Sequence, residues 1–177
     1  QEGKPEGNRK VNGGKCRGTT GRTETGTRWI LETSHILIAT GSVPACPPIP
    51  GSSLPGVVTS DGLLDKKDMF EHLIIIGGGV IGMEFASVYS SLGHGVTVIE
   101  ALDRILPTMD KEIAQNLKMI MKKRNVDIHT GAKVEEILQT EDGKGLICRY
   151  TEKDKPCEAR ADGILIATGR RLIQAVL

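Results

Sequence analysis

The chain has 177 residues, enough for one ordinary domain and part of a second. Its formal net charge of +1 gives no electrostatic footprint for nucleic acid, so we expect no nucleic-acid partner. No apolar run approaches the roughly 20 residues of a membrane-spanning helix, so we expect no membrane partner either.

The leading part of the chain allows two interpretations. Residues 1–28 are rich in Gly, Thr, Lys and Arg, as in a disordered basic tail or in a polar sheet whose partners lie elsewhere. The next stretch, "WILETSHILIATG", predicts a short strand, a turn and a buried strand over 36–41. Five prolines within 42–56 predict an ordered, extended connector. A short helix follows it, with Ser60 or Asp61 as the cap.

After this helix the pattern becomes a regular alternation of strands and helices. "LIIIG", 95–100 and 126–130 predict buried strands, and 80–93 and 110–125 predict helices, the second capped by Asp110. We expect the helices to bury the apolar residues that recur at helical spacing: Ile81, Phe85, Val88 and Leu92 in the first, and Ile113, Leu117, Ile120 and Met121 in the second.

The last third of the chain changes to strands alone. Residues 133–140, 145–151 and 156–161 are separated by turn signals, which predicts an antiparallel meander. Residues 164–169 then repeat the letters Ile-Leu-Ile-Ala-Thr-Gly of 36–41, again typical of a strand that is buried on both faces. The predicted fold is therefore α/β: a Rossmann-like parallel sheet with flanking helices and an antiparallel three-stranded meander.

"GGGVIG" satisfies the pattern G-x-G-x-x-G with Gly77, Gly79 and Gly82, and includes Gly78. It follows an apolar strand and opens a helix, and an acid, Glu100, ends the next strand. In such a motif the first glycine permits the tight turn. The second lets the backbone touch a pyrophosphate, and the third lets helix and strand pack closely. The context predicts a dinucleotide-binding site.

The residues around the motif also indicate which dinucleotide binds. The helix start at Val80 and Ile81 offers free N–H groups to the phosphates. A carboxylate at Glu100 can accept hydrogen bonds from a ribose diol and repels the 2′-phosphate of NADP. The only nearby cation that would favour that phosphate is Arg104, which is equally explained as a turn residue. The pattern favours NAD.

Glu84 has two interpretations. As a carboxylate in the first turn of a helix it is favoured by the helix dipole at the surface. Alternatively, it faces the nicotinamide end of the cofactor.

The cysteines and histidines predict no further chemistry. The four cysteines, at 16, 46, 148 and 157, have no metal-ligand spacing, so reduced thiols are expected. We therefore expect no metal site and assign no catalytic residue.

The sequence "GGGVIGMEFASVYSSLGHGVTVIEALDRILPTMDKEIA", with "IATGS…PPIPG" before it and "ATGRR" after it, resembles the pyridine nucleotide–disulfide oxidoreductases. Within that family the similarity is closest to the dihydrolipoamide dehydrogenases. It covers the chain from about Trp29 to Arg171. In this family an FAD domain is interrupted by an NAD domain, and an "ATG" strand lies at each boundary.

The resemblance implies roles for particular residues. Gly77, Gly79 and Gly82 match the pyrophosphate turn, and Glu100 matches the acid at the adenosine ribose. The resemblance favours the nicotinamide interpretation of Glu84. Two further matches complete the set of candidate residues: Val134 at the adenine and Gly169 in the cofactor cleft.

The resemblance also implies a domain order. Residues 1–42 would hold a polar leader and the terminal strands of an incomplete FAD domain, and 43–70 a proline-rich connector with a short helix. Residues 71–171 would form the NAD-binding domain, followed by a tail, 172–177, that departs from the family pattern. The FAD motif, the CxxxxC redox disulfide and the His–Glu pair of full members are absent from this sequence, so we expect the segment to be inactive alone.

In a full member, dihydrolipoamide and NAD would be converted to lipoamide and NADH through FAD and a redox disulfide. The implied partners are the remaining FAD and interface domains, a second subunit in a homodimer, and a 2-oxo acid dehydrogenase complex. The implied location is the cytoplasm, or the mitochondrial matrix in a eukaryote. Alternatives are the corresponding segment of an NADH oxidase, mercuric reductase or transhydrogenase, or a free-standing NAD-sensing module.

Overall fold

A computed structural model describes residues 16–22, 28–35, 37 and 39–173. The chain divides into two compact units. The first comprises residues 1–41 with 172–177, and the second comprises residues 42–171.

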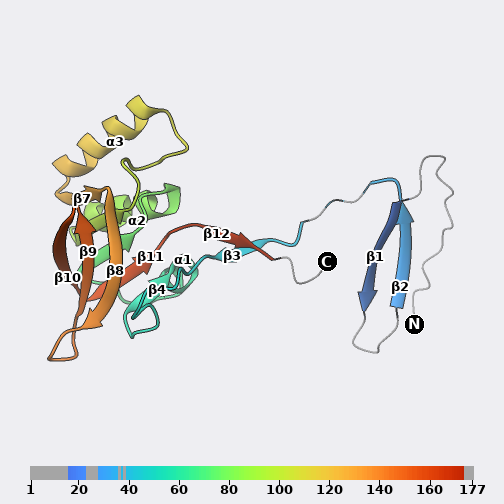
Figure 1. Ribbon diagram of the computed structural model, residues 1–177, viewed down its shortest axis with the longest axis horizontal. Helices are drawn as coiled ribbons and strands as arrows, with labels where there is room; N and C mark the ends of the chain where they lie inside the picture. Colours follow the sequence, from blue (N-terminus) through green and yellow to red (C-terminus); the bar gives the residue numbers. More distant parts are fainter. Residues whose placement is uncertain (1–15, 23–27, 36, 38, 174–177) are drawn as a thin grey trace. The chain divides into compact units, whose positions relative to one another are not determined.

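The first unit holds an antiparallel hairpin, in which β1 (Cys16–Arg22) pairs with β2 (Arg28–Thr33) (Figure 1). Part of the leading stretch therefore forms a strand. The strand expected over 36–41 is wrong for the residues described there: none of them lies in a strand, and Leu37 is 90% exposed. An apolar strand is stable only between sheet neighbours, and none of the described strands pairs with these residues.

The second unit is built on a five-stranded parallel sheet, which confirms the predicted fold class (Figure 1). The strand order is β4 (Val57–Thr59), β11 (Gly163–Ile166), β5 (His72–Ile76), β6 (Gly95–Glu100) and β7 (Val126–Thr130). The central strand β5 is covered on both faces, since Leu73, Ile74 and Ile75 are all 0% exposed. The apolar half of the second "ILIATG", Ile164–Ile166, lies in β11, which is parallel to β5.

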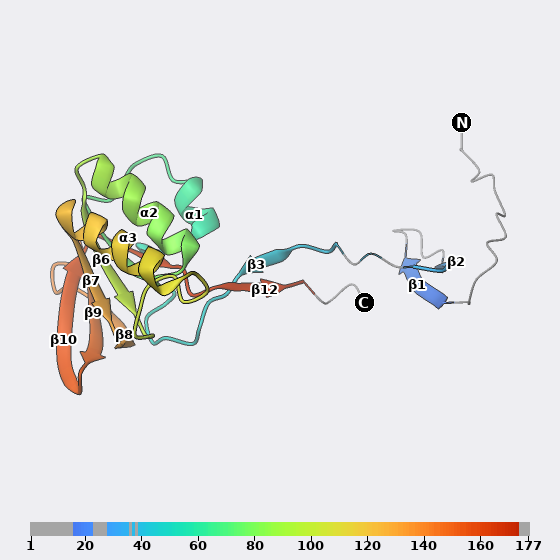
Figure 2. The ribbon, with the colours of Figure 1, turned by 90° about the horizontal axis from the view of Figure 1, so that it is seen from above.

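Two helices cover one face of this sheet and a meander covers the other (Figure 2). The helices are α2 (Val80–Ser91) and α3 (Lys111–Lys123). The antiparallel meander consists of β8 (Ala132–Gln139), β9 (Leu146–Glu152) and β10 (Lys155–Ala161), as predicted. Leu73 and Ile75 join the apolar core under the helices, whereas Ile74 and Ile76 join the core under the meander.

The buried faces of the two helices agree only in part with those expected: Met121 is buried, and Phe85 and Leu117 are partly buried against the core. In α2, Val88 and Leu92 are 51% and 61% exposed, and the buried residues are Gly82, Met83, Ala86 and Tyr89. In α3, Ile113 and Ile120 are 59% and 49% exposed, and the buried residues are Ala114 and Met121. In α2, Gly82 and Ala86 let the helix backbone approach the strands closely, and Met83 and Tyr89 on the same face fill the core. The predicted cap of α3 is confirmed, because Asp110 accepts the N–H of Glu112 at 2.8 Å.

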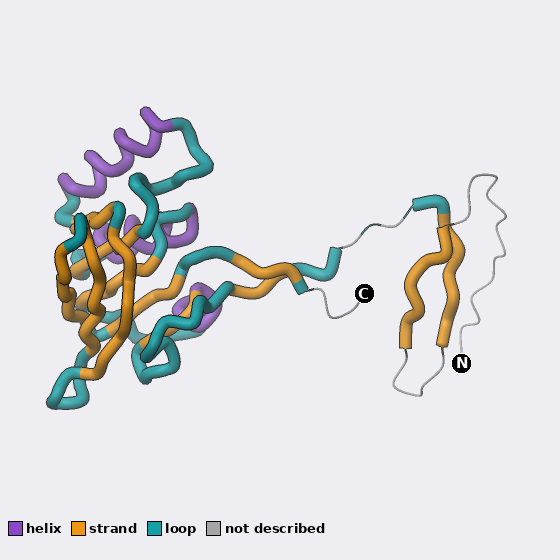
Figure 3. The backbone as a smooth tube through the Cα atoms, in the orientation of Figure 1, coloured by secondary structure: helices purple, strands orange, loops and turns teal. Residues whose placement is uncertain are grey.

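The proline-rich connector leads into the edge of the sheet. After β3 (Ser42–Pro44), which pairs with β12 (Arg170–Leu172), the chain is loop as far as β4 (Figure 3). The strand β4 was not expected, because three residues are too few for a recognisable alternation. The short helix α1 (Ser60–Leu64) follows, and its cap is Thr59, whose hydroxyl accepts the N–H of Gly62, and not Ser60 or Asp61. None of the helices described is both long and apolar enough to cross a membrane.

Candidate nucleotide-binding site

The glycine-rich segment forms a tight turn between β5 and α2. Gly77 has φ +111°, a conformation that favours glycine, and its N–H donates to the carbonyl oxygen of Ile99 at 2.9 Å. A Cβ at this position would lie 2.5 Å from the carbonyl oxygen of Ala167, at the end of the neighbouring strand β11. The turn therefore depends on a glycine here for both its dihedral angle and its closeness to β11.

The other two glycines of the motif have opposite surroundings. A Cβ on Gly82 would overlap the carbonyl oxygen of Gly77, so this glycine allows α2 to pack against the turn. A Cβ on Gly79 would meet nothing within 4 Å. Gly79 is also the N-cap of α2 and supplies no side-chain hydrogen bond to the first turn. Gly79, Val80 and Ile81 line an open cleft, so the start of α2, the end of a helix that binds anions, borders this cleft.

Glu100 connects the end of β6 to this turn. Its carboxylate accepts the N–H of Gly78 at 2.6 Å through one oxygen and the N–H of Leu102 at 2.8 Å through the other. The residue is only 7% exposed, so the acid is held in place by the backbone in a largely dry setting. A carboxylate has about four acceptor positions, and two remain for a further ligand.

The loop after Glu100 is held against the same turn. The N–H of Leu106 donates to the carbonyl oxygen of Gly78 at 2.8 Å. The carbonyl oxygen of Leu102 accepts the N–H of Gly131 at 2.7 Å, which connects the loop to the start of β8. Three segments that are distant in sequence are therefore fixed around the end of the sheet.

These segments surround a cleft of about 1030 Å³ at the carboxyl ends of the parallel strands. This is the edge at which open α/β sheets bind their ligands. Seven of the sequence-predicted residues line it: Gly77, Gly79, Val80, Ile81, Glu100, Val134 and Gly169. The other three, Gly78, Gly82 and Glu84, are not among its lining residues. Gly78 and Gly82 lie behind the surface of the turn, with the contacts described above.

Glu84 is exposed on the first turns of α2, outside the residues that line the cleft. It lies one helical turn after Val80, which does line the cleft. Within this unit its carboxylate is therefore at the surface, at the same end of the helix as the glycine turn.

The proline-rich connector forms one wall of the cleft. The sequence did not indicate this role for the connector. Pro47, Pro48 and Ile49 line the cleft, and the connector is attached at both ends. The N–H of Ala45 donates to the carbonyl oxygen of Gly169 at 2.9 Å, and the N–H of Ile137 donates to that of Pro50 at 2.8 Å. The clustered prolines indicated an ordered connector, but no local pattern shows which surface such a segment covers.

Further lining residues were also missed: Ala101, Leu102, Pro107, Thr108, Lys133, Glu135 and Thr168. Pro107 and Thr108 lie farther along the loop after Glu100, and the others lie within two residues of a predicted site residue. Arg104, the expected rival for a 2′-phosphate, does not line the cleft; its guanidinium donates to the carbonyl oxygen of Pro107 at 2.9 Å.

The described cysteines lie outside this cleft. Cys46, Cys148 and Cys157 are free thiols, and burial raises the pKa of Cys148 to about 12. Among the described residues no group of three or more His, Cys, Asp and Glu side chains has the arrangement of a metal site. The arrangement in the cleft is therefore one for binding: backbone N–H groups at a helix start, a fixed carboxylate and apolar walls.

Residues 7–177 match the family model described as pyridine nucleotide-disulphide oxidoreductase. The chain belongs to this family. Its relatives include dihydrolipoyl dehydrogenase 3 of Pseudomonas putida, 38% identical over 152 residues, which are 85% of this chain and 32% of that protein. The probable pyridine nucleotide-disulfide oxidoreductase RclA of Escherichia coli is 36% identical over 175 residues, 98% of this chain and 34% of that protein.

Solved structures of the family have the same fold. The HOCl-induced flavoprotein disulfide reductase RclA from Escherichia coli superposes with a TM-score of 0.69 at 38% identity, covering 85% of this chain and 33% of that one. This member of the pyridine nucleotide-disulfide oxidoreductases thus spans about a third of the length of the relatives it matches. The family name implies flavin and pyridine nucleotide as cofactors of the multidomain proteins to which such a segment corresponds.

Proposed function

We propose that residues 71–171 are the NAD(H)-binding domain of a flavoprotein disulfide oxidoreductase similar to dihydrolipoamide dehydrogenase. The observation that carries this proposal is the position of Glu100, a buried carboxylate in the cleft that is fixed to Gly78. An anionic acceptor beside a glycine turn accommodates a ribose diol and opposes a 2′-phosphate.

The cleft fits the cofactor in its other parts. The open space beside Gly79 leaves room for a pyrophosphate against the first turn of α2. Val134 and the connector residues Pro47 and Pro48 supply apolar walls, Val134 being the residue we assign to the adenine. NAD(H), once bound, supplies hydride chemistry, and the residues of this chain bind and orient it.

Glu84 and Gly169 are proposed for the nicotinamide side. Gly169 lines the cleft with φ +133°, beyond the end of β11. Glu84 is exposed on α2, where a carboxylate is available to a flavin-bearing domain or to the nicotinamide.

For the whole protein we propose the reaction of dihydrolipoamide with NAD to give lipoamide and NADH, by way of FAD and a redox disulfide. Residues 1–42 would belong to the FAD domain and 43–70 would connect the two domains. The whole protein would be a homodimer, associated with a 2-oxo acid dehydrogenase complex in the cytoplasm or the mitochondrial matrix. RclA, which matches 98% of the chain, supports a second candidate: a flavoprotein disulfide reductase similar to RclA.

Backbone ¹⁵N–¹H spectra recorded during a titration with NADH test the binding proposal. We expect saturable shifts at Gly77–Gly79, at Ala101 and Leu102, and at Ala132–Val134, because these segments meet in the cleft. Saturable binding that shifts none of these amides would place the nucleotide elsewhere and contradict the proposal.

A further inference from the structure

A second cavity, of about 370 Å³, lies between α3 and the loop that follows β6. Asp103, Arg104 and Ile105 line it from the loop, whereas Ala101 and Leu102 of the same loop line the nucleotide cleft. Its lining residues on α3 are Lys111, Ala114, Gln115, Lys118, Met119 and Lys122. The cavity is therefore separate from the cleft, although one loop contributes to both.

The charges that line this cavity are mostly of one sign. Three lysines and Arg104 surround it, and Asp103 is the only acid among its lining residues. Their spacing along α3 places Lys111, Lys118 and Lys122 on one face of the helix. The helix dipole accounts for Lys122 in the last turn, but not for Lys111 and Lys118, which lie before it.

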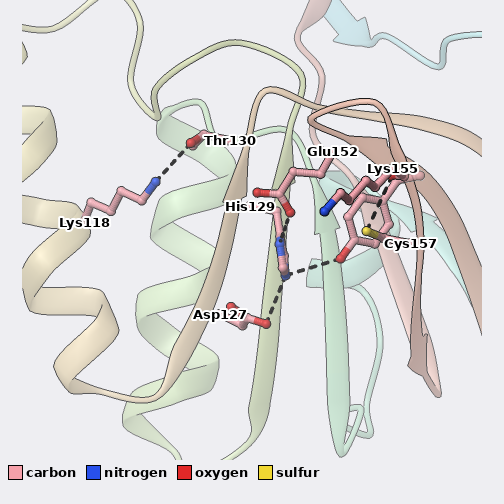
Figure 4. Close-up of polar contacts among 8 residues, drawn as sticks. Lys118, Asp127, His129, Thr130, Glu152, Lys155 and Cys157 are labelled. Carbon is pink, nitrogen blue, oxygen red and sulfur yellow. Dashed lines mark hydrogen bonds and ion pairs between the residues drawn. The ribbon is translucent and has the colours of Figure 1, made fainter.

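Lys118 lines this cavity and is held by a hydrogen bond to Thr130, which Figure 4 shows. Its ammonium group donates to the hydroxyl of Thr130 at 3.0 Å, which leaves two of its three hydrogens for other acceptors. The pKa of Lys118 is lowered, first by burial and then by the charge of Lys122. The charge of Glu152 raises the pKa of Lys118, and the carboxylate of Glu152 also forms a hydrogen bond with His129 at 2.8 Å. Burial and the charge of Lys122 therefore outweigh the attraction of Glu152 at Lys118.

We propose that the cavity between α3 and residues 103–105 binds a small phosphate-bearing anion. Arg104 and three lysines line one space, and phosphate oxygens accept hydrogen bonds from such cationic donors strongly. The volume is at the lower end of the range of about 300–1,000 Å³ for small-molecule sites. The shared chemistry is the phosphate group, which inorganic phosphate or a phosphorylated metabolite supplies.

Titrations followed by ¹⁵N–¹H spectra at constant ionic strength, with chloride replaced stepwise by the ligand, test this site. Inorganic phosphate and a hexose monophosphate are the two probes, and tighter binding of the second would identify an organic phosphate as the ligand. We expect saturable shifts at the amides of residues 103–105 and along the face of α3 with both probes. Each single variant, Lys118→Gln or Lys122→Gln, should weaken binding about tenfold.

Lys123→Gln is the matched control, because it removes the same charge from the same helix without altering the lining of the cavity. It should leave the affinity unchanged. If Lys123→Gln weakens phosphate binding as much as the variants of the lining lysines do, the effect is one of general charge and the proposal is overturned. Shifts without saturation would overturn it as well. Shifts confined to residues 77–82 would place the phosphate at the start of α2 and would also overturn it, while leaving the NADH proposal intact.

Discussion

The carboxylate of Glu100 accepts the N–H of Gly78 at 2.6 Å, so the last residue of β6 holds the turn that follows β5. The acid is buried, and its second oxygen accepts the N–H of Leu102. The residue that we assign to the ribose therefore also holds the backbone that we assign to the pyrophosphate. Its replacement should affect folding as well as binding.

We expect Glu100→Ala to lower the free energy of unfolding by about 1–3 kcal/mol, because two buried N–H groups lose their acceptor. Urea denaturation measures this. Glu135→Ala is the matched control, since Glu135 lines the cleft but is exposed, and it should change stability little. Equal stability of Glu100→Ala and wild type would show that the bonds to Gly78 and Leu102 do not contribute.

Substitutions at two glycines of the motif should separate an effect on NADH binding from an effect on folding. Gly79→Val adds a side chain in open space, so the protein should stay folded and lose most of its NADH affinity. Gly82→Val forces a Cβ into the carbonyl oxygen of Gly77 and should lower the free energy of unfolding by about 3 kcal/mol. Thermal unfolding and NADH titration of both variants measure the difference. A folded Gly79→Val protein with wild-type affinity would place the pyrophosphate elsewhere.

The thiols should differ in reactivity. Cys46 is exposed, whereas Cys148 is buried with its pKa raised to about 12, so it stays protonated at neutral pH. Because the thiolate is the nucleophile, iodoacetamide at pH 8 should label Cys46 rapidly and Cys148 only after unfolding. Peptide mass spectrometry with and without urea gives the two rates. Rapid labelling of Cys148 in the folded protein would contradict its burial.

Much of the second unit was predictable from local patterns. The apolar runs of β5 and β11 and the spacing of the glycines identified the parallel sheet and the turn, because each signal lies within a few residues. The faces of α2 and α3 were predicted only in part: Phe85, Leu117 and Met121 contact the core as expected, but other expected residues are exposed. Close packing of Gly82 and Ala86 on the sheet decided the face of α2, and a count of large apolar residues does not detect this.

The walls of the cleft could not be predicted from the sequence, for a different reason. Pro47 and Pro48 reach the site through hydrogen bonds that join Ala45 to Gly169 and Pro50 to Ile137, more than eighty residues apart. Periodicity describes only neighbours in the chain, so it predicted an extended connector without its position.

The segment alone should carry no flavin chemistry. We expect the purified chain to be colourless and to show no oxidation of dihydrolipoamide by NAD, because Cys148 and Cys157 lie in the meander and outside the cleft. Absorbance near 450 nm and an NADH-formation assay test this. A flavin absorbance band, or measurable lipoamide reduction by NADH, would contradict the assignment of FAD and disulfide chemistry to other domains.

The preference between NADH and NADPH tests the central claim most directly. Calorimetric titration of the folded chain should give an affinity for NADH at least about tenfold higher than for NADPH, because the fixed anion of Glu100 repels a 2′-phosphate. Glu100→Gln removes that charge at nearly constant shape. It should reduce the difference between the affinities for NADH and NADPH. Equal affinities in the wild type, or tighter binding of NADPH, would contradict the assignment of Glu100 to the adenosine ribose of NAD.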